Sequence, residues 1–111
     1  MAGKFEIFKD KRGEFCFRLK ASNGEIILQS ESYKAKSGCK NGIASVQKNC
    51  TDANCFVTKE TKSGQYRFNL RARNNQVIGT SQNYKTEKSR DAGIASVKKH
   101  APNAKVEDLA S

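Results

Sequence analysis

The chain lacks several features that would assign it to a familiar class of protein. It has no run of about 18 apolar residues, the length that a membrane-spanning helix requires. Its first residues, Met-Ala-Gly-Lys-Phe-Glu, lack the apolar core of a secretory signal. We therefore expect no contact with a membrane and a cytoplasmic location.

Metal-ligating side chains are scarce and poorly spaced. The chain has one histidine, His100, and no Cys-x-x-Cys pair among its four cysteines, which are Cys16, Cys39, Cys50 and Cys55. A structural zinc site needs four well-spaced Cys or His ligands. The cysteines could instead pair as disulfides, but a cytoplasmic location favours reduced thiols. We predict free thiols, no metal and no other cofactor.

Catalytic motifs are also missing. The chain contains no Gly-x-Ser-x-Gly, no phosphate-binding loop and no Gly-x-Gly-x-x-Gly segment. Nucleophilic catalysis needs a base within hydrogen-bond reach of the nucleophile, and we expect the lone His100 to be a solvated residue at a helix end. Carboxylates near turns and helix ends, such as Asp10 and Asp52, form no recognisable acid–base pair. We predict that the protein is not an enzyme.

What the chain does contain is an internal repeat. Residues 5–50 align with residues 56–101 without a gap, at a constant offset of 51. The most similar stretches are Phe17–Asn23 with Phe68–Asn74, and Gly42–Val46 with Gly93–Val97. The cysteines and the histidine have no equivalent in the other copy, so they do not belong to the repeated framework.

The repeat predicts how the chain is organised. A copy of about 50 residues is near the size at which a lone hydrophobic core becomes marginal, and two copies are too few for a solenoid. We therefore expect one domain, residues 1–111, made of two pseudo-symmetric halves at about residues 5–54 and 56–109.

Each copy shows the pattern of three strands. Residues 5–9, 15–21 and 25–30 form the first set, and in the second of these apolar and polar residues alternate as in a half-buried strand. Asn23-Gly24 predicts a two-residue type I′ hairpin. That loop pairs Leu19 with Leu28, Lys20 with Ile27 and Ala21 with Ile26, which places Ile27 on the outer face.

A helix is expected to follow the strands. Cys39, Ile43, Val46 and Cys50 fall on one helical stripe, as do Ile94, Val97 and Ala101. Ser37 and Thr86 are candidate N-caps, Pro102 ends the second helix, and residues 106–109 could form a last strand. A glycine at the same helical position in both copies, Gly42 and Gly93, indicates that the helix backbone approaches the sheet closely there.

These elements predict an α+β fold. Each repeat reads β-β-β-α, with a further strand possible, and the two repeats form one shared, mainly antiparallel sheet with two helices on one face. The predicted core residues are Phe5, Phe17, Leu19, Ile26, Leu28, Ile43, Val46, Phe56, Phe68, Leu70, Val77, Ile94 and Val97.

The residues also resemble a known family. The run Phe-x-Phe-Arg-Leu-Lys-Ala-x-Asn-Gly-Glu-x-Ile-Leu-x-Ser-Glu-x-Tyr covers residues 15–33, Gly-Ile-Ala-Ser-Val follows at 42–46, and both return in the second half. This pattern resembles the YegP-like family of small bacterial proteins. The resemblance implies two β-β-β-α-β units that form one sheet and exchange their last strands, with residues 55–60 and 106–109 as the exchanged segments. It implies no activity and no catalytic residues.

Charge is the largest imbalance of composition. Lys and Arg number 21 against 11 Asp and Glu, a formal net charge of +10. Such a surface favours contact with polyanions, through release of the counterions that surround phosphates. The simpler alternative is that these side chains only make the surface soluble.

The outer face of the predicted sheet is the most testable part of this charge. Glu6 and Glu25 dilute it, but cations and isoleucines alternate across it. The candidate binding residues are Arg18, Lys20, Ile27, Arg67, Arg71, Arg73 and Ile78. Cations mixed with apolar surface are typical of faces that hold single-stranded nucleic acid. The alternative is that Lys and Arg stems merely cover Ile27 and Ile78.

A protein partner is a further alternative, because an exposed apolar strip on an open sheet can mark an interaction surface. The tandem arrangement already supplies the pairing that a single-copy relative would need, so we expect a monomer. Tyr33 and Tyr84 could line two equivalent pockets, but we favour a structural role over the edge of the core. The sequence thus predicts a small basic module for binding or interaction.

Overall fold

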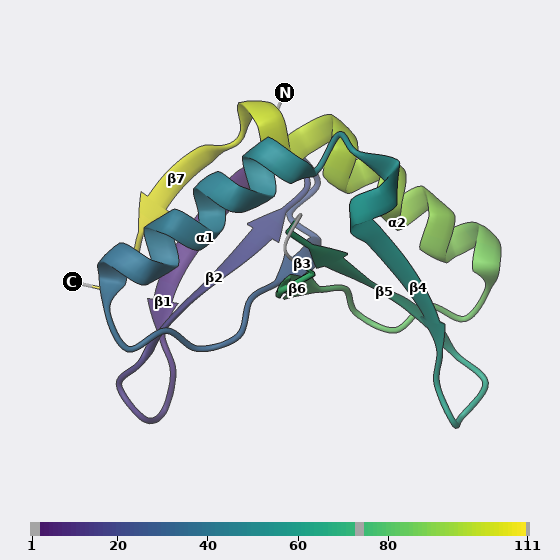
Figure 1. Ribbon diagram of the computed structural model, residues 1–111, viewed down its shortest axis with the longest axis horizontal. Coiled ribbons are helices and arrows are strands. Elements are labelled where there is room, and N and C mark those ends of the chain that lie inside the picture. Colours follow the sequence, from purple (N-terminus) through teal and green to yellow (C-terminus); the bar gives the residue numbers. More distant parts are fainter. Residues whose placement is uncertain (1–2, 73–74, 111) are drawn as a thin grey trace.

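The computed structural model describes residues 3–72 and 75–110 (Figure 1). Its elements are β1 (Lys4–Lys9), β2 (Phe15–Lys20), β3 (Ile26–Gln29), α1 (Lys36–Asn49), β4 (Phe56–Glu60), β5 (Tyr66–Arg71), β6 (Val77–Thr80), α2 (Glu87–His100) and β7 (Lys105–Asp108). A short 3-10 turn follows each helix, at Ala53–Cys55 and at Ala101–Asn103. The order of elements repeats once along the chain, as the internal repeat predicts.

The seven strands form one sheet in the order β4-β5-β6-β3-β2-β1-β7. Neighbouring strands are antiparallel except for β1 and β7, which are parallel. Both helices lie on the same side of the sheet (Figure 1), with α1 against β2 and β6, and α2 against β5 and β3. The fold is therefore α+β, with two helices on one face of a mainly antiparallel sheet, and the prediction is confirmed.

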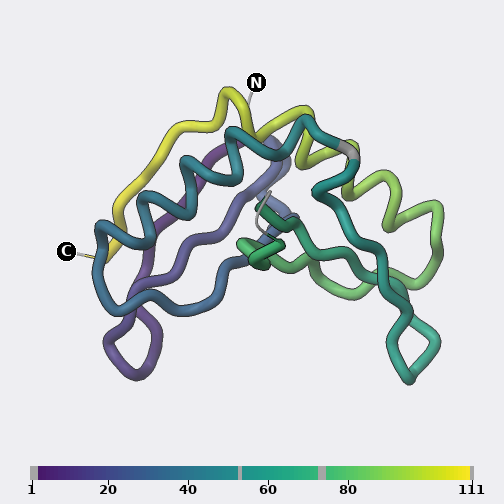
Figure 2. Tube along the Cα trace, in the orientation of Figure 1, coloured from purple at the N-terminus to yellow at the C-terminus, as the bar shows by residue number. Residues whose placement is uncertain are grey.

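The two halves meet at the centre of the sheet (Figure 2). The only residue pair between β3 and β6 in the described chain is Gln29 with Thr80. These two positions are equivalent by the offset of 51, so a pseudo-twofold axis passes between them. Each helix packs across this junction onto a strand of the other half, which ties the halves together on the helix side of the sheet.

Only one of the two expected strand exchanges occurs. The C-terminal strand β7 leaves the second half and pairs with β1 of the first half. Residues 55–60, in contrast, enter β4, which is the first strand of the second half and pairs with β5. The six residues between α1 and β4 form a turn and a 3-10 turn, and they are too few to add a separate exchanged strand.

The turn at Asn23-Gly24 is not the predicted type I′ hairpin. Gly24 has a positive φ of 84°, whereas Asn23 does not. The Gly24 N–H donates to the carbonyl of Ala21 at 2.9 Å, and the Ala21 N–H donates to the carbonyl of Glu25 at 2.9 Å. This is a type I turn closed by a glycine in the left-handed region, the arrangement of a longer hairpin with a bulge.

The longer turn shifts the first pairs of the hairpin. Leu19 pairs with Leu28 as predicted, but Lys20 pairs with Ile26, so Ile27 lies opposite no residue of β2. The predicted pairs Lys20–Ile27 and Ala21–Ile26 are wrong. The bulge absorbs the extra residue locally and leaves the rest of the register intact.

The core lies between the sheet and the helices and draws on both halves. Its largest fully buried side chains include Phe5, Ile7, Phe17, Leu19, Leu28, Val46, Phe68, Leu70 and Val97. Four of the predicted core residues, Ile26, Phe56, Val77 and Ile94, are only half-buried. Ile27 and Ile78 are buried in place of Ile26 and Val77, because the bulge changes which residue of each short strand is enclosed.

The glycines inside the helices mark a close approach to aromatic side chains. A Cβ at Gly42 would lie 2.5 Å from the hydroxyl of Tyr33 and 2.9 Å from the ring of Phe17. Gly93 meets Tyr84 and Phe68 in the same way. The expected close contact is confirmed.

The helix starts agree with the sequence at one of the two predicted caps. Thr86 is the N-cap of α2, and its side chain accepts from the backbone N–H of Ser89 at 3.0 Å. Ser37 lies inside α1, whose N-cap is Ala35 without a side-chain hydrogen bond. Ala35 is the equivalent of Thr86 by the offset of 51, so the repeat fixes the helix start even where the capping side chain is absent.

Candidate polyanion-binding face

A row of paired residues crosses the face of the sheet that is turned away from the helices, which we call the outer face. The register of the strands places one residue of each strand from β4 to β1 in this central row. The order is Val57, Asn69, Thr80, Gln29, Arg18 and Glu6. Residues equivalent by the repeat lie at mirrored places in the row. The two halves can therefore be compared position by position, and they differ most in charge.

In the first half, one buried carboxylate collects the cations. Glu6 is only 4% exposed, and its carboxylate oxygens lie 2.7 Å from Arg18, 3.1 Å from Lys20 and 3.3 Å from Lys4. Burial alone raises the pKa of Glu6, but the hydrogen bonds from these three cations outweigh it and lower the pKa to about 2. Arg18 and Lys20 therefore share one carboxylate, which offsets part of their charge.

The aromatic side chain of Phe8 is already engaged by a cation of this face. The guanidinium group of Arg18 lies 4.7 Å from the centre of the Phe8 ring, within the range of a cation–π contact. Because the guanidinium group covers it, the Phe8 ring does not offer a free surface on which a base could stack.

The second half keeps one cation of this cluster and lacks the carboxylate, because Asn69 stands at the position of Arg18 and Cys55 at that of Lys4. Val57 stands at the position of Glu6, and Arg71 stands at the position of Lys20. Arg67 lies on the same strand as Arg71, four residues away, and pairs across β4 with Lys59. The described chain contains no acidic side chain bonded to either arginine.

The two arginines are the least satisfied polar groups of the structure. The Nε atoms of Arg67 and Arg71 are buried and have no hydrogen-bond partner among the described residues. Both side chains are half-buried, so their stems lie along the sheet. Buried polar atoms without partners are rare in proteins, and a bound ion or ligand is one explanation for them.

The predicted apolar strip of the outer face does not exist. Ile27 is 3% exposed and Ile78 is 7% exposed, so neither presents surface to a ligand, and both are wrong as exposed binding residues. Arg18 and Lys20 keep about a quarter of their side-chain surface exposed, which agrees with the alternative that long cationic stems cover the sheet. Arg73 lies outside the described residues.

The structure gives His100 a structural role. The side chain is 7% exposed, and its Nδ1 lies 2.8 Å from the carbonyl oxygen of Ser96. Its equivalent Asn49 is also buried, and Nδ2 of Asn49 donates to the carbonyl of Ser45 at 2.8 Å. The expectation of a solvated histidine is wrong: histidine and asparagine fill the same buried position and make the same bond within the helix.

A polar cluster that the sequence did not reveal lies at the first hairpin. The hydroxyl of Ser32 donates to Asp10 at 2.6 Å, and Arg12 donates to Ser32 at 3.2 Å. The bond from Ser32 is the main cause that lowers the pKa of Asp10 below its ordinary value, so Asp10 stays ionised and is a poor proton donor or base. Asp10 also accepts from the backbone of Arg12 and Glu14. These bonds shape the turn.

The cysteines are all buried, and the described residues contain no group of three or more His, Cys, Asp or Glu side chains that could hold a metal ion. Burial is the main cause that raises the pKa of Cys39, to about 11, and that of Cys50 above its ordinary value. Thiols that ionise so reluctantly are poor nucleophiles.

Tyr33 and Tyr84 occupy equivalent structural positions. Each forms an isolated β-bridge, Tyr33 with Phe15 and Tyr84 with Tyr66. The Tyr33 ring stacks on Phe17 at 6.3 Å, and burial is the main cause that raises the pKa of both tyrosines. Each ring fills the space between the sheet and the helical glycine, which leaves no equivalent pair of pockets there.

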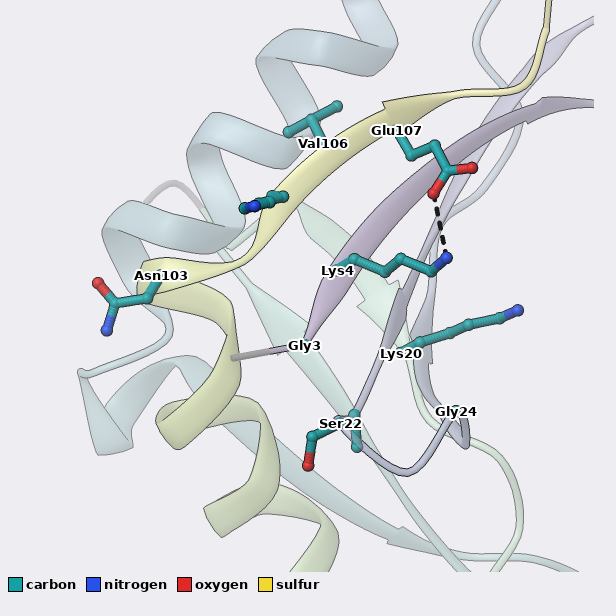
Figure 3. Close-up of a pocket in the computed structure, with 10 residues that line it drawn as sticks. Gly3, Lys4, Lys20, Ser22, Gly24, Asn103, Val106 and Glu107 are labelled. Atoms are coloured by element: carbon teal, nitrogen blue, oxygen red, sulfur yellow. Dashed lines mark hydrogen bonds and ion pairs between the residues drawn. The ribbon is translucent and has the colours of Figure 1, made fainter. Parts of the chain in front are cut away.

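A groove of about 710 Å³ lies beside the start of β1 (Figure 3). It is lined by the turn after β2 and by the segment that leads into β7. Lys4 reaches across it to Glu107 at 3.0 Å, and Lys20 is bonded to Glu6. These two cations of the groove are already paired, so they are less available to an anionic ligand than Arg67 and Arg71.

No helix within the described residues is long and apolar enough to cross a membrane. The large hydrophobic residues that are exposed are Val106 in β7 and Leu109 just after it, at 48% and 47%. The exposed apolar surface therefore lies at one edge of the sheet and not on its outer face.

Comparison with known proteins assigns the repeats to one family model. The model, described as a domain of unknown function and named DUF1508, matches residues 10–56 and again residues 61–108. The two matches follow the internal repeat: the first begins after β1 and the second ends with β7. They support the tandem repeat independently of the fold.

Proteins of the same length are similar to the whole chain. A UPF0339 protein encoded in the 5′ region of the ptx operon of Stutzerimonas stutzeri is 57% identical over 98% of both chains. A UPF0339 protein of Acinetobacter baylyi is 54% identical over 98% of both chains. The solution NMR structure of yegP from Escherichia coli, a protein of unknown function, has a TM-score of 0.95 at 45% identity and covers 100% of this chain and 96% of its own.

Proposed function

The chain belongs to the DUF1508 family, which is described without a function, and from this premise we propose that it is a non-enzymatic binding module for single-stranded nucleic acid. The phosphate backbone would lie on the outer face of the second half, along β5. The Nε atoms of Arg67 and Arg71, which are buried without a hydrogen-bond partner among the described residues, are the observation that carries the proposal.

The charge of the two halves favours the second half as the site. An anion near β2 would compete with Glu6 for Arg18 and Lys20, because both cations already lie within 3.1 Å of that carboxylate. Near β5 there is no such competitor, since Val57 replaces Glu6. A phosphate that binds Arg67 or Arg71 meets a guanidinium fork with free donors, the group best suited to phosphate oxygens.

The shape of the face favours an extended strand over a compact ligand. Arg67 and Arg71 are four residues apart on β5, which separates their Cα atoms by roughly 13 Å. Lys59 lies directly opposite Arg67, and Asn69 with Thr80 supplies polar groups between the two arginines. A row of cations along an open strand can follow a phosphate backbone, whereas a small anion would engage only one end of it.

The mode of binding follows from what the face offers. Phe8 is covered by Arg18, so base stacking contributes little. Binding should therefore be independent of base sequence and steeply dependent on salt, because nearly all of its free energy comes from counterion release. The net charge of +10 adds a long-range attraction that speeds the encounter.

The proposal is tested by NMR titration with a ten-nucleotide oligothymidylate at 50 and 200 mM salt. We expect chemical-shift changes at residues 57–59, 67–71 and 78–80, with affinity that falls steeply between the two salt concentrations. The double variant R67Q/R71Q should reduce the slope of log affinity against log salt by about 0.7 for each phosphate that is no longer neutralised.

The matched control removes the same charge from the helix side. Lys48 and Lys99 are exposed residues of α1 and α2, so K48Q/K99Q lowers the net charge by two without touching the outer face. If the control weakens binding as much as R67Q/R71Q, the basic charge acts only in bulk and the proposed site is wrong. Shifts that cluster on β1 and β2 would also contradict it.

A further inference from the structure

The equivalent strands β1 and β4 differ at the edge that faces away from the centre of the sheet. β1, the first strand of the first half, is covered along its outer edge by β7. β4 is the equivalent strand of the second half, and no described strand lies beyond it (Figure 1). The repeat therefore contains one place for an added parallel strand that the chain fills and one that it leaves open.

The filled place shows which contacts receive the added strand. On α1, Lys36 binds the carboxylate of Asp108 at 2.7 Å, and Gln47 donates to the carbonyl of Ala101 at 3.2 Å. Ile43 of α1 and Val106 of β7 line one groove. An ionic contact, an amide donor and an apolar contact thus hold the segment at residues 101–108 between α1 and β1.

The open place keeps most of this arrangement. The equivalents of Lys36, Ile43 and Gln47 on α2 are Glu87, Ile94 and Lys98. The isoleucine is retained, and Lys98, whose ammonium group lies 5.6 Å from the centre of the Phe56 ring, can donate to carbonyl oxygens where Gln47 does. Of the three contacts, only the ionic one differs in charge, because the acidic Glu87 replaces the basic Lys36.

Burial shows that the open place is incomplete. Ile43 is 2% exposed and Phe5 is fully buried, whereas their equivalents Ile94 and Phe56 are only half-buried. The difference follows from the missing strand, because Phe5 pairs with Val106. A strand beside β4 would enclose Phe56 and Ile94 and gain the free energy of burying apolar surface.

The backbone of β4 is ready for such a partner. Phe68 directs its N–H to the side chain of Ser81 and its carbonyl to the N–H of Ser81, both on the side of β6. Thr58 pairs with Phe68, so this is a non-hydrogen-bonded pair, and the N–H and carbonyl of Thr58 point away from β5. Its equivalent Ile7 accepts from Leu109 with its outward carbonyl.

We propose that the free edge of β4 is a docking site for an extended segment of a partner protein, which adds in parallel as β7 adds to β1. The segment carries an apolar residue at the position of Val106, against Phe56 and Ile94, and a basic residue at the position of Asp108, against Glu87. Addition of a strand to an exposed sheet edge is a common mode of peptide recognition.

Charge excludes a second copy of this chain as the occupant. Its β7 would bring Asp108 next to Glu87, and the neighbouring position held by Lys40 on α1 is Asp91 on α2. Arg90 pairs with Asp91 at 3.0 Å, but Glu87 forms no ion pair within the described chain. Glu87 and Asp91 therefore repel a segment with the acidic residue of β7 and favour a segment with a basic residue at that position.

The inference is tested with two peptides in an NMR titration of the whole protein. One has the sequence of residues 101–110, and the other carries the change D108K. We expect the D108K peptide to shift the amides of residues 56–60 and the methyl groups of Ile94. It should bind about two- to five-fold more tightly than the unchanged peptide, the effect of one exposed ion pair.

Two variants separate strand addition from unspecific contact. E87K should reverse the preference between the two peptides. T58P removes the outward N–H without breaking the ladder to β5 and should abolish the shifts on β4, since proline is tolerated on edge strands. Equal binding of the two peptides, shifts away from β4, or self-association in sedimentation that T58P removes would each overturn the inference. Neither variant changes Arg67 or Arg71, so R67Q/R71Q tests nucleic-acid binding on the outer face separately.

Discussion

At the scale of single residues, position 6 and its counterpart at position 57 control the charge of the outer face. Glu6 lies among three cations and binds each of them through its carboxylate. Val57 leaves Arg71 without that partner. The halves also differ at neighbouring positions of this face, where Asn69 replaces Arg18 and Arg67 replaces Cys16.

The Glu6 cluster predicts how stability depends on pH. The folded state holds the pKa of Glu6 at about 2, below its ordinary value of 4.5, so the ionised form stabilises the fold. This contribution is fully present above about pH 4.5 and is lost as the pH falls toward 2. E6Q should therefore lower the free energy of unfolding by roughly 2–3 kcal/mol at pH 7 and by much less at pH 2.

Urea unfolding at pH 7, 4.5 and 2 measures this effect. E60Q is the control, because Glu60 is exposed on β4 and forms no ion pair within the described chain; it should change stability by less than about 0.5 kcal/mol at every pH. A loss in E6Q that persists unchanged at pH 2 would show that the glutamate acts through shape and not through charge.

Residues with unusual surroundings were the hardest to predict from the sequence. The sequence predicts His100 as a solvated helix end, because the pattern of residues does not show that this side chain is buried. Its alignment with Asn49 was the available signal, since both side chains can donate one hydrogen bond to a carbonyl four residues earlier. The unpartnered Nε atoms of Arg67 and Arg71 depend on side-chain direction and had no signal in the sequence.

At the scale of elements, the strands and helices followed directly from periodicity. The second copy confirmed each boundary, so β2 and β5 and the two helices were predicted to within a few residues. The hairpin turn was not, because Asn-Gly suits both a two-residue turn and a type I turn with glycine in the fourth position. The neighbouring turns decide the matter: Gly13 and Gly64 take the same positive φ at the same place.

The contact between each helix and its tyrosine predicts an unusual response to alanine. Glycine inside a helix normally costs about 1 kcal/mol against alanine. At Gly42 a Cβ would lie 2.5 Å from the hydroxyl of Tyr33 and 2.9 Å from the Phe17 ring. Overpacking of this kind costs about 1–3 kcal/mol, so G42A should lower the free energy of unfolding by about 0.5–2 kcal/mol.

The same helix supplies the control. At Gly38 a Cβ would meet Tyr33 at 3.4 Å, an ordinary contact, and G38A should raise the free energy of unfolding by up to about 1 kcal/mol. Both variants are compared by equilibrium urea unfolding. In addition, Y33F should recover part of the loss in G42A, because it removes the nearest atom. Stabilisation by G42A would show that the ring moves aside freely and that the close approach is not a constraint.

At the scale of the whole molecule, the repeat predicted the shared sheet and the side on which the helices lie. It did not predict that only one strand would be exchanged. The segments that follow the two helices give the physical reason. The segment after α2 leads into β7, which pairs with β1, whereas the segment after α1 leads into β4, which pairs with β5.

The pseudo-symmetry also allows a test of the proposed function, in which a carboxylate is added to the second half or removed from the first. V57E reproduces in the second half the position of Glu6, beside Arg71. It should weaken binding of oligothymidylate and lower its salt slope by about 0.7 for each phosphate that the face no longer neutralises. E6V removes the carboxylate that binds Arg18 and Lys20 and should raise both quantities, while Lys4 stays bonded to Glu107. The net charge changes by one in each variant, in opposite directions.

The location of the NMR shifts distinguishes a site from bulk charge. In E6V, new shifts should appear on β1 and β2 while those on β5 persist, whereas V57E should remove the shifts on β5 and create none. V106E is the control for V57E, since it adds one negative charge on the exposed edge strand β7. If V106E weakens binding as much as V57E, the outer face has no special role, and the attraction comes from the net charge alone. If V57E weakens binding and V106E does not, the absence of a carboxylate at position 57 is required for binding on the outer face of the second half.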